Sequence, residues 1–243
     1  MRVAEKIEKK IRQMIPGNTF KYQELGIEPE EYSAATKAIE RLIKRDVIKR
    51  ASTGLFYIPK QTAFGNIKPR EEELLKPYLF DGDQRTAYIT GIALYNRMGI
   101  TTQVPKNIRL ASRDKRIITK IGSVEVKSVK SYVEVTNENY YLLELLDVIK
   151  DFKSIPDADK TQTIRFLLSK LAELTVKEKE KEKAITIALK YPPRVRALTG
   201  ALLSQLNPAD LLQELKKSIN PLTIYKYKIT SQQLPTIENW NIQ

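Results

Sequence analysis

Two residue types with wide catalytic use are missing from this 243-residue sequence, which contains neither cysteine nor histidine. Their absence removes disulfides, the usual zinc ligands and the commonest general base. Nucleophilic triads built on Ser-His or Cys-His pairs are therefore excluded. The nine glycines are scattered, and none of them forms a Gly-rich loop of the kind that holds phosphate groups. We expect no cofactor, no metal and no catalytic residue, and we predict that the protein is not an enzyme.

Long apolar runs are missing as well. No stretch approaches the roughly 18 apolar residues that cross a membrane, and the opening "MRVAEKIEKKIRQM" lacks the apolar centre of a secretory signal. These features predict a cytoplasmic protein with no membrane partner. Hydrophobic residues make up 42% of the chain, which is enough material for the cores of two compact domains.

Acidic residues are too few to balance the basic ones. The chain has 42 Lys and Arg against 29 Asp and Glu, a formal net charge of +13. The excess is concentrated: residues 1–60 contain thirteen basic and eight acidic residues, and residues 105–130 contain eight and two. Clustered positive charge favours a polyanionic partner through counterion release. The alternative is a generally basic surface that aids solubility.

The first sixty residues have the pattern of a winged helix-turn-helix domain. Apolar spacing predicts a helix over about residues 4–14, a short helix in "TFKYQELGI", and a longer helix after Pro29 with Ala35, Ala38, Ile39, Leu42 and Ile43 inside. "VIKRAS" and "LFYIP", separated by Thr53-Gly54, predict a β-hairpin. In such folds the longer helix enters the major groove of DNA and the hairpin lies along the backbone.

The outward residues of this helix and hairpin are therefore candidates for contact with double-stranded operator DNA. Short polar and basic side chains of the helix are expected at base edges, and those of the hairpin at phosphates. The candidates are Ser33, Thr36, Lys37, Arg41, Lys44, Lys49, Arg50, Ser52 and Thr53. Two alternatives stay open: the residues are ordinary solvated surface, or the domain binds a protein instead.

The remaining sequence predicts an α+β protein with a linker at 61–80 and a second domain at 81–243. A mixed α/β unit is expected at 81–136, with a helix over "QRTAYITGIALYNRMGI" ended by Gly99. Three or four strands follow in "NIRLAS", "RIITKIG", "SVEVKSV" and "SYVEVT", with a turn at residues 122–123. A helical region is expected at 139–220, including a helix capped by Asn207 before Pro208. The tail at 221–243 is expected to add an edge strand or to bind a partner through Trp240.

A second cluster of basic residues lies in this mixed unit. Besides Lys106, its members are Arg109, Arg113, Lys115, Arg116, Lys120, Lys127 and Lys130. The cluster suits an extended DNA footprint, RNA, or an acidic protein surface. Strand edges that carry lysine against aggregation are the plainer explanation.

The order Asp114, then Glu125-Val126-Lys127, is also the order that metal-dependent nucleases place on adjacent strands. No second carboxylate lies between Asp114 and Glu125, and a relative that has lost its activity would show the same residues. A nuclease is therefore kept only as an alternative.

Several segments resemble the AbiEi-type antitoxin and transcriptional regulator family of type IV toxin-antitoxin systems. "IRQMIPGNTFKYQELGI" and "AIERLIKRDVIKRASTGLFYIPK" resemble its N-terminal winged domain. "AYITGIALYNRMGITTQVPKNIRLAS" and "ALKYPPRVRALTGALLSQL" resemble its C-terminal antitoxin region, so the resemblance covers most of residues 1–206. It implies a phage-defence antitoxin that represses its own operon and opposes a nucleotidyltransferase-like toxin or the RNA target of that toxin. The alternative is a stand-alone transcriptional regulator whose C-terminal domain senses a ligand or a protein.

Overall fold

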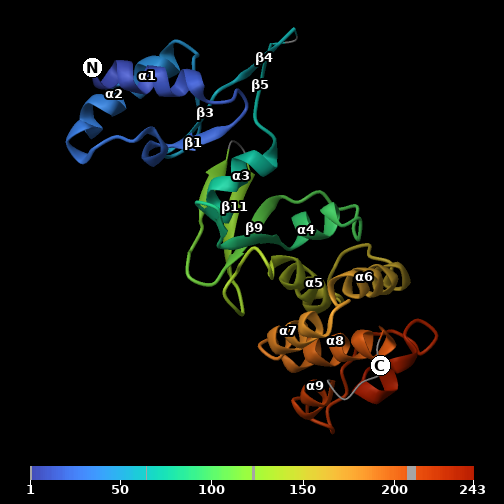
Figure 1. The fold of residues 1–243 in the computed structure, drawn as a ribbon. Helices are drawn as coiled ribbons and strands as arrows, with labels where there is room; N and C mark the ends of the chain where they lie inside the picture. Colours follow the sequence, from blue (N-terminus) through green and yellow to red (C-terminus); the bar gives the residue numbers. More distant parts are fainter. Residues whose placement is uncertain (1, 64, 122–123, 207–211) are drawn as a thin grey trace. The chain divides into compact units, whose positions relative to one another are not determined.

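The protein is α+β, as predicted, and divides into two compact units. The computed structural model describes residues 2–63, 65–121, 124–206 and 212–243. Unit 1 comprises Met1–Asp83 and Ile118–Val126, and unit 2 comprises Gln84–Ile117 and Lys127–Gln243 (Figure 1). Each unit is described separately below.

Two helices and two short 3-10 turns are the first helical elements along the chain in unit 1. They are α1 (Val3–Gln13), η1 (Tyr22–Leu25), η2 (Pro29–Glu31) and α2 (Tyr32–Lys44). Their apolar stripes meet in one core that includes Ile7, Ile11, Leu25, Ile39 and Leu42. Both predicted long helices are confirmed, because the spacing of their apolar residues matches the side that is buried.

The sheet of unit 1 has three antiparallel strands in the order β1-β3-β2. They are β1 (Thr19–Lys21), β2 (Lys49–Ser52) and β3 (Leu55–Tyr57). The β2–β3 hairpin was predicted, whereas β1 was expected to be helical and is a strand instead. Phe20 of β1 lies opposite Phe56 of β3, with ring centroids 5.8 Å apart. Pairing with a distant strand fixes this conformation, and a three-residue strand is too short to show an alternating pattern.

The segment expected as a linker at 61–80 belongs to unit 1 and contains strands and a helix among its described residues. Strands β4 (Lys60–Thr62) and β5 (Gly65–Ile67) form an antiparallel two-stranded ribbon. Helix α3 (Glu71–Leu79) follows, with Leu75 and Leu79 buried, and leads into β6 (Phe80–Asp81).

A second antiparallel pair joins unit 1 from later in the chain. Strand β10 (Thr119–Ile121) pairs with the first residues of β11 (Val124–Lys130), and β10 also contacts β2. Both strands were predicted; "RIITKIG" is longer than the observed β10, and β11 ends one residue later than "SVEVKSV". The turn expected at residues 122–123 lies outside the described residues.

Unit 2 begins with a correction to the expected helix over residues 84–100. The structure has strands β7 (Gln84–Arg85) and β8 (Ala87–Thr90), followed by the short helix α4 (Ile92–Arg97). All four residues of β8 are buried, and a fully buried strand has the same unbroken apolar run as a buried helix. Gly91, with φ of 73°, separates strand from helix, and Gly99 ends the helix as predicted.

Strand β9 (Asn107–Ser112) pairs antiparallel with β8 along its length. The fourth expected strand, "SYVEVT", is absent: residues 131–136 are irregular in the structure. The Thr136 N–H donates to the side chain of Asn139 at 2.8 Å. This segment therefore leads into the next helix and does not pair as a strand of the sheet.

Helices follow in the region 139–220, where they were predicted, and a 3-10 helix lies in the tail. The elements are α5 (Tyr140–Asp151), α6 (Lys160–Leu174), α7 (Glu178–Ala188), α8 (Pro193–Leu206), α9 (Gln213–Lys217) and η4 (Pro235–Trp240). The cap expected at Asn207 and Pro208 lies outside the described residues. In the described part of the chain, no helix combines the length and apolar character needed to cross a membrane.

The expected partner-binding role of Trp240 is not supported, because the side chain is only 2% exposed. Its indole N–H donates to Ser204 Oγ at 3.0 Å. A Cβ on Gly200 would lie 2.3 Å from the indole ring, so the ring packs directly on the backbone of α8. The tail is part of the core of unit 2.

Candidate nucleic-acid interface

Helix α2 presents one polar face to solvent because its apolar stripe is turned into the core. Five candidates lie on that outward face and all are exposed: Ser33, Thr36, Lys37, Arg41 and Lys44. Glu40 is exposed beside them. The Thr36 hydroxyl donates to the backbone oxygen of Tyr32 at 2.9 Å, one turn earlier. The helix thus offers three cations and two hydroxyl groups on one surface.

The cations of this face differ from Lys6 and Arg12 of α1, which have carboxylate partners. Within the described residues, no carboxylate is within 4 Å of the charged groups of Lys37, Arg41 or Lys44. On α1, by contrast, Arg12 pairs with Glu8 at 3.1 Å. Because unpaired surface cations retain their full attraction for an external anion, the α2 face is the more suitable one for phosphate or base edges.

The hairpin contributes fewer free groups than the sequence suggested. Arg50 is exposed, with its guanidinium carbon 5.8 Å from the ring centroid of Phe56, and Thr53 is exposed at the turn. Lys49, however, pairs with Asp46 at 3.5 Å. Ser52 is half-buried. The hairpin therefore directs Arg50 and Thr53 outward, while internal partners hold Lys49 and Ser52.

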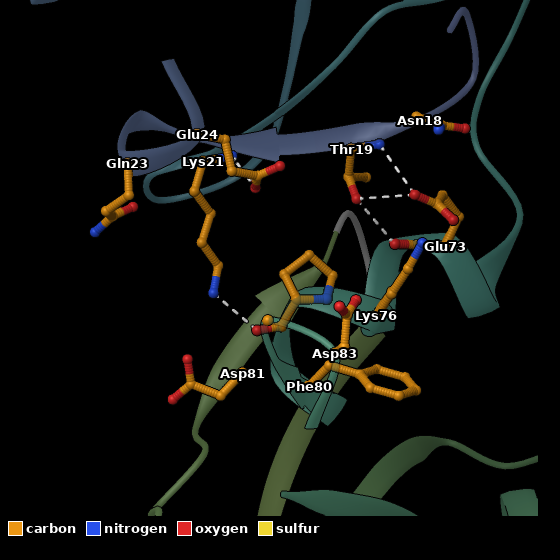
Figure 2. Close-up of a pocket in the computed structure, with 12 residues that line it drawn as sticks. Asn18, Thr19, Lys21, Gln23, Glu24, Glu73, Lys76, Phe80, Asp81 and Asp83 are labelled. Atoms are coloured by element: carbon orange, nitrogen blue, oxygen red, sulfur yellow. Dashed lines mark hydrogen bonds between the residues drawn. The ribbon is translucent and has the colours of Figure 1, made fainter. Parts of the chain in front are cut away.

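Helix α3 is tied to the sheet by hydrogen bonds at both ends of β1. Figure 2 shows Thr19 against Glu73: its N–H and hydroxyl donate to Glu73 Oε1, each at 3.3 Å, and the hydroxyl also lies 3.0 Å from the Glu73 carbonyl oxygen. Lys21 Nζ donates to the carbonyl oxygen of Pro77 at 2.8 Å. The hydroxyls of Ser52 and Tyr78 lie 2.7 Å apart in a hydrogen bond. These contacts fix the hairpin, β1 and α3 as one assembly.

A polar pocket of about 630 Å³ lies beside these contacts in unit 1 (Figure 2). Its lining residues are Asn18, Thr19, Lys21, Gln23, Glu24, Glu73, Lys76, Pro77, Phe80, Asp81, Gly82 and Asp83. Acidic and basic groups are mixed in it, and Lys21 and Glu73 already hold α3. Among the described residues there is no group of three or more acidic side chains that could hold a metal ion. Two of its lining residues, Lys21 and Glu73, thus contribute to the docking of α3.

The second basic cluster is divided between the units. Arg109, Arg113, Lys115, Arg116, Lys127 and Lys130 belong to unit 2, and Lys120 belongs to unit 1; all seven are exposed. Arg113 is partly satisfied, since it donates to the carbonyl oxygens of Ser131 and Tyr132 at 3.3 and 3.4 Å. Lys120 lies directly opposite Glu125 in the β10–β11 register.

The three residues of the nuclease-like order lie at the surface of the protein. Asp114, Glu125 and Lys127 are exposed, and Glu125 has Lys120 as its cross-strand neighbour. Opposite charges at such positions stabilise a sheet. Glu125 therefore faces a lysine across the β10–β11 pair.

A buried polar network in unit 2 was not predicted from the sequence. Tyr88 Oη and Thr90 Oγ1 donate to Asp147 Oδ2 at 3.0 and 2.5 Å, and Lys150 Nζ lies 2.6 Å from Asp147 Oδ1. Burial, with the Asp147 charge as a smaller cause, raises the pKa of Tyr88 far above its usual range. Nearby, Tyr95 donates to Asp151 at 2.7 Å. The only signal in the sequence is that Asp147 lies among leucines on what becomes a buried helix.

An ion pair with a buried carboxylate joins α4 to α5. Arg97 donates to Glu144 Oε1 at 2.7 Å, with the Glu144 side chain 6% exposed. Burial raises the pKa of Glu144, although Arg97 opposes the shift. Every charged group of this network has a partner, so its role is to hold β8, α4 and α5 together.

Fold and surface together define an α+β protein whose first unit carries an exposed basic helix and hairpin. The chain belongs to a family of unknown function (DUF6088), which matches residues 6–190. A search of curated proteins finds no match. Among solved structures, the chain is similar to the crystal structure of the RV2827C protein from Mycobacterium tuberculosis. The TM-score is 0.53 at 12% identity, over 93% of this chain and 85% of that one, which is a likeness of fold.

Proposed function

We propose that the protein is a DNA-binding transcriptional repressor that contacts DNA with the outward face of α2 and with the β2–β3 hairpin. The observation that carries the proposal is the set of exposed cations on α2 that have no carboxylate partner among the described residues. The order of α1, η1, α2 and the hairpin, with the sheet order β1-β3-β2, supports a winged helix-turn-helix assignment. In this arrangement α2 enters the major groove and Arg50 contacts phosphate.

Repression follows from occlusion in this proposal. The protein binds an operator at its own promoter and blocks transcription, with base contacts from α2 and salt-dependent affinity from phosphate contacts. The test is DNA binding to fragments upstream of its own gene at rising salt. Each phosphate contact adds about 0.9 to the magnitude of the slope of log K against log salt concentration, so we expect a steep decline in affinity. A flat salt response contradicts the proposal.

The antitoxin role rests on the AbiEi-type resemblance and is the second part of the proposal. The C-terminal region opposes a nucleotidyltransferase-like toxin, either directly or through the RNA target. A neighbouring gene for such a protein is expected, and co-expression of this chain is expected to relieve the toxicity of its product. A Lys37→Ala/Arg41→Ala variant is the matched control, because it is expected to lose repression and keep protection. A lone gene, with no toxic neighbour, favours a stand-alone regulator.

Nuclease activity remains a separate alternative with a direct test. Cleavage of duplex DNA with added Mg²⁺ is measured for the wild type and for Asp114→Ala. We expect no cleavage by either protein. Metal-dependent cleavage that disappears in Asp114→Ala would replace the repressor proposal with an enzymatic one.

A further inference from the structure

The β4–β5 ribbon is the least buried regular structure in unit 1. Lys60, Gln61, Asn66 and Ile67 are all exposed, Ile67 at 53%. Figure 1 shows the two strands as a narrow ribbon that runs away from α3. An isolated two-stranded ribbon is only marginally stable in water, because it has no second layer on which to bury a face. A ribbon of this kind is better explained by a partner than by a role in the core.

The charge pattern of the sequence indicates the chemistry of that partner. From residue 47 to residue 70 the chain contains no Asp or Glu, and it contains five basic residues: Lys49, Arg50, Lys60, Lys68 and Arg70. This stretch covers both the β2–β3 hairpin and the ribbon. Only two residues separate β3 from β4, so the ribbon begins where the proposed DNA-contacting hairpin ends. A positively charged ribbon without carboxylates is complementary to a polyanion.

The register of the ribbon places two amides together. Gln61 lies directly opposite Asn66, so their side chains share one face, with Lys68 two residues beyond Asn66. Lys60 lies opposite Ile67 on the other face. Asn and Gln side chains bind adenine with two hydrogen bonds, and a two-stranded β-ribbon fits the major groove of DNA. The ribbon therefore carries groups for base edges on one face and lysines for the flanking phosphates.

We propose that the β4–β5 ribbon is a second DNA-contacting element, which enters a groove beside the segment bound by α2. The proposal rests on the proposed function and extends it, since it assigns a binding role to Lys60, Gln61, Asn66 and Lys68 that neither the helix nor the hairpin supplies. Gln61 and Asn66 contact base edges, and Lys60 and Lys68 contact phosphates. A second copy of the chain is the other occupant that an exposed strand pair admits, and the experiment below distinguishes the two.

Binding to fragments upstream of its own gene and to random duplexes is measured for three double variants across a range of salt. For Lys60→Ala/Lys68→Ala we expect about tenfold weaker binding and a salt slope smaller by about 1.8, the value for two lost phosphate contacts. For Gln61→Ala/Asn66→Ala we expect about a tenfold loss of preference for the upstream fragment over random DNA. Lys216→Ala/Lys217→Ala removes the same charge from an exposed part of α9 and is expected to bind as the wild type does.

The outcomes separate the ribbon from the proposed function. If the ribbon variants bind as the wild type does while Arg50→Ala binds more weakly, the ribbon has no DNA role and the repressor proposal stands. If the wild type binds no DNA, both proposals fail. If the ribbon variants change the mass seen by sedimentation velocity with DNA affinity unchanged, the ribbon joins copies of the chain, which also overturns the inference. Thermal unfolding verifies folding, and Lys68→Gln replaces any double variant that does not fold.

Discussion

Helix α2 of unit 1 and helix α5 of unit 2 place charged residues next to apolar ones in opposite ways. On α2, Lys37 and Arg41 face solvent and have no carboxylate partner among the described residues. On α5, Glu144 and Asp147 are buried, and each is paired with a cation. A buried charge requires an internal partner because desolvation is costly, whereas an exposed one does not. The comparison separates charges that hold the fold from charges available to a ligand.

The largest expected effect comes from a change to the buried pair of Asp147 and Lys150. Asp147→Asn keeps the shape of the side chain but leaves Lys150, whose side chain is 17% exposed, without its counter-ion. Removing one member of a buried pair typically costs about 3–5 kcal/mol, and we expect about 3 kcal/mol here because Lys150 retains some contact with water. Unfolding in denaturant, compared between the wild type and Asp147→Asn, measures this loss of stability.

The matched control is Asp46→Asn in unit 1. Asp46 also pairs with a lysine, Lys49 at 3.5 Å, but its own side chain is 73% exposed. Its φ of 57° suits asparagine as well as aspartate. We expect a change within about 0.5 kcal/mol. Equal losses for the two variants would show that burial does not distinguish these pairs.

The exposed side of the comparison is tested by Lys37→Ala and Arg41→Ala. If these side chains contact bases, each replacement costs about 1–3 kcal/mol of binding free energy on the operator and leaves the free energy of unfolding nearly unchanged. Arg50→Ala, by contrast, is expected to weaken binding to all sequences alike. Lys179→Ala, an exposed lysine of α7, is the control and should leave binding unchanged. Equal losses on random DNA for all three interface variants would contradict base reading by α2.

This contrast also explains which features the sequence revealed. The stripe of α2 and the Thr53-Gly54 turn are local patterns, and their predictions are confirmed. Strand β1 and the early part of the expected helix at 84–100 depend on pairing with residues far along the chain, which no local period records. The candidate residues on α2 could be named because an amphipathic helix determines its own outward face. The partner of Ser52 could not be named, since Tyr78 lies on α3, 26 residues further along the chain. The partner of Lys49 is Asp46, only three residues away, and this local pair was missed.

A smaller effect is expected from the hydrogen bond between Ser52 and Tyr78. Tyr78→Phe removes only the hydroxyl and releases the hairpin from α3 at that point. We expect a loss of about 1 kcal/mol in unfolding free energy, the usual net value of one hydrogen bond. In a double-mutant cycle with Ser52→Ala, the two losses should not add, because either change alone breaks the bond. Additive losses would mean that the two hydroxyls stabilise the unit independently.

The smallest expected effect concerns pH and the buried pair of α5. Burial raises the pKa of Glu144, so the folded protein holds this proton more tightly than the unfolded chain does. The stabilisation is therefore fully present in acid and is lost as the pH rises through the folded-state pKa. Arg97 opposes the shift, which keeps the effect small.

Glu144→Gln is expected to remove this pH-dependent part of the stability when unfolding free energies are compared between about pH 4 and 7. Glu173→Gln, which alters an exposed pair with Lys170, should leave the pH profile as it is. If Glu144→Gln also leaves the profile unchanged, the carboxylate is solvated, and the buried side of the comparison rests on Asp147 alone.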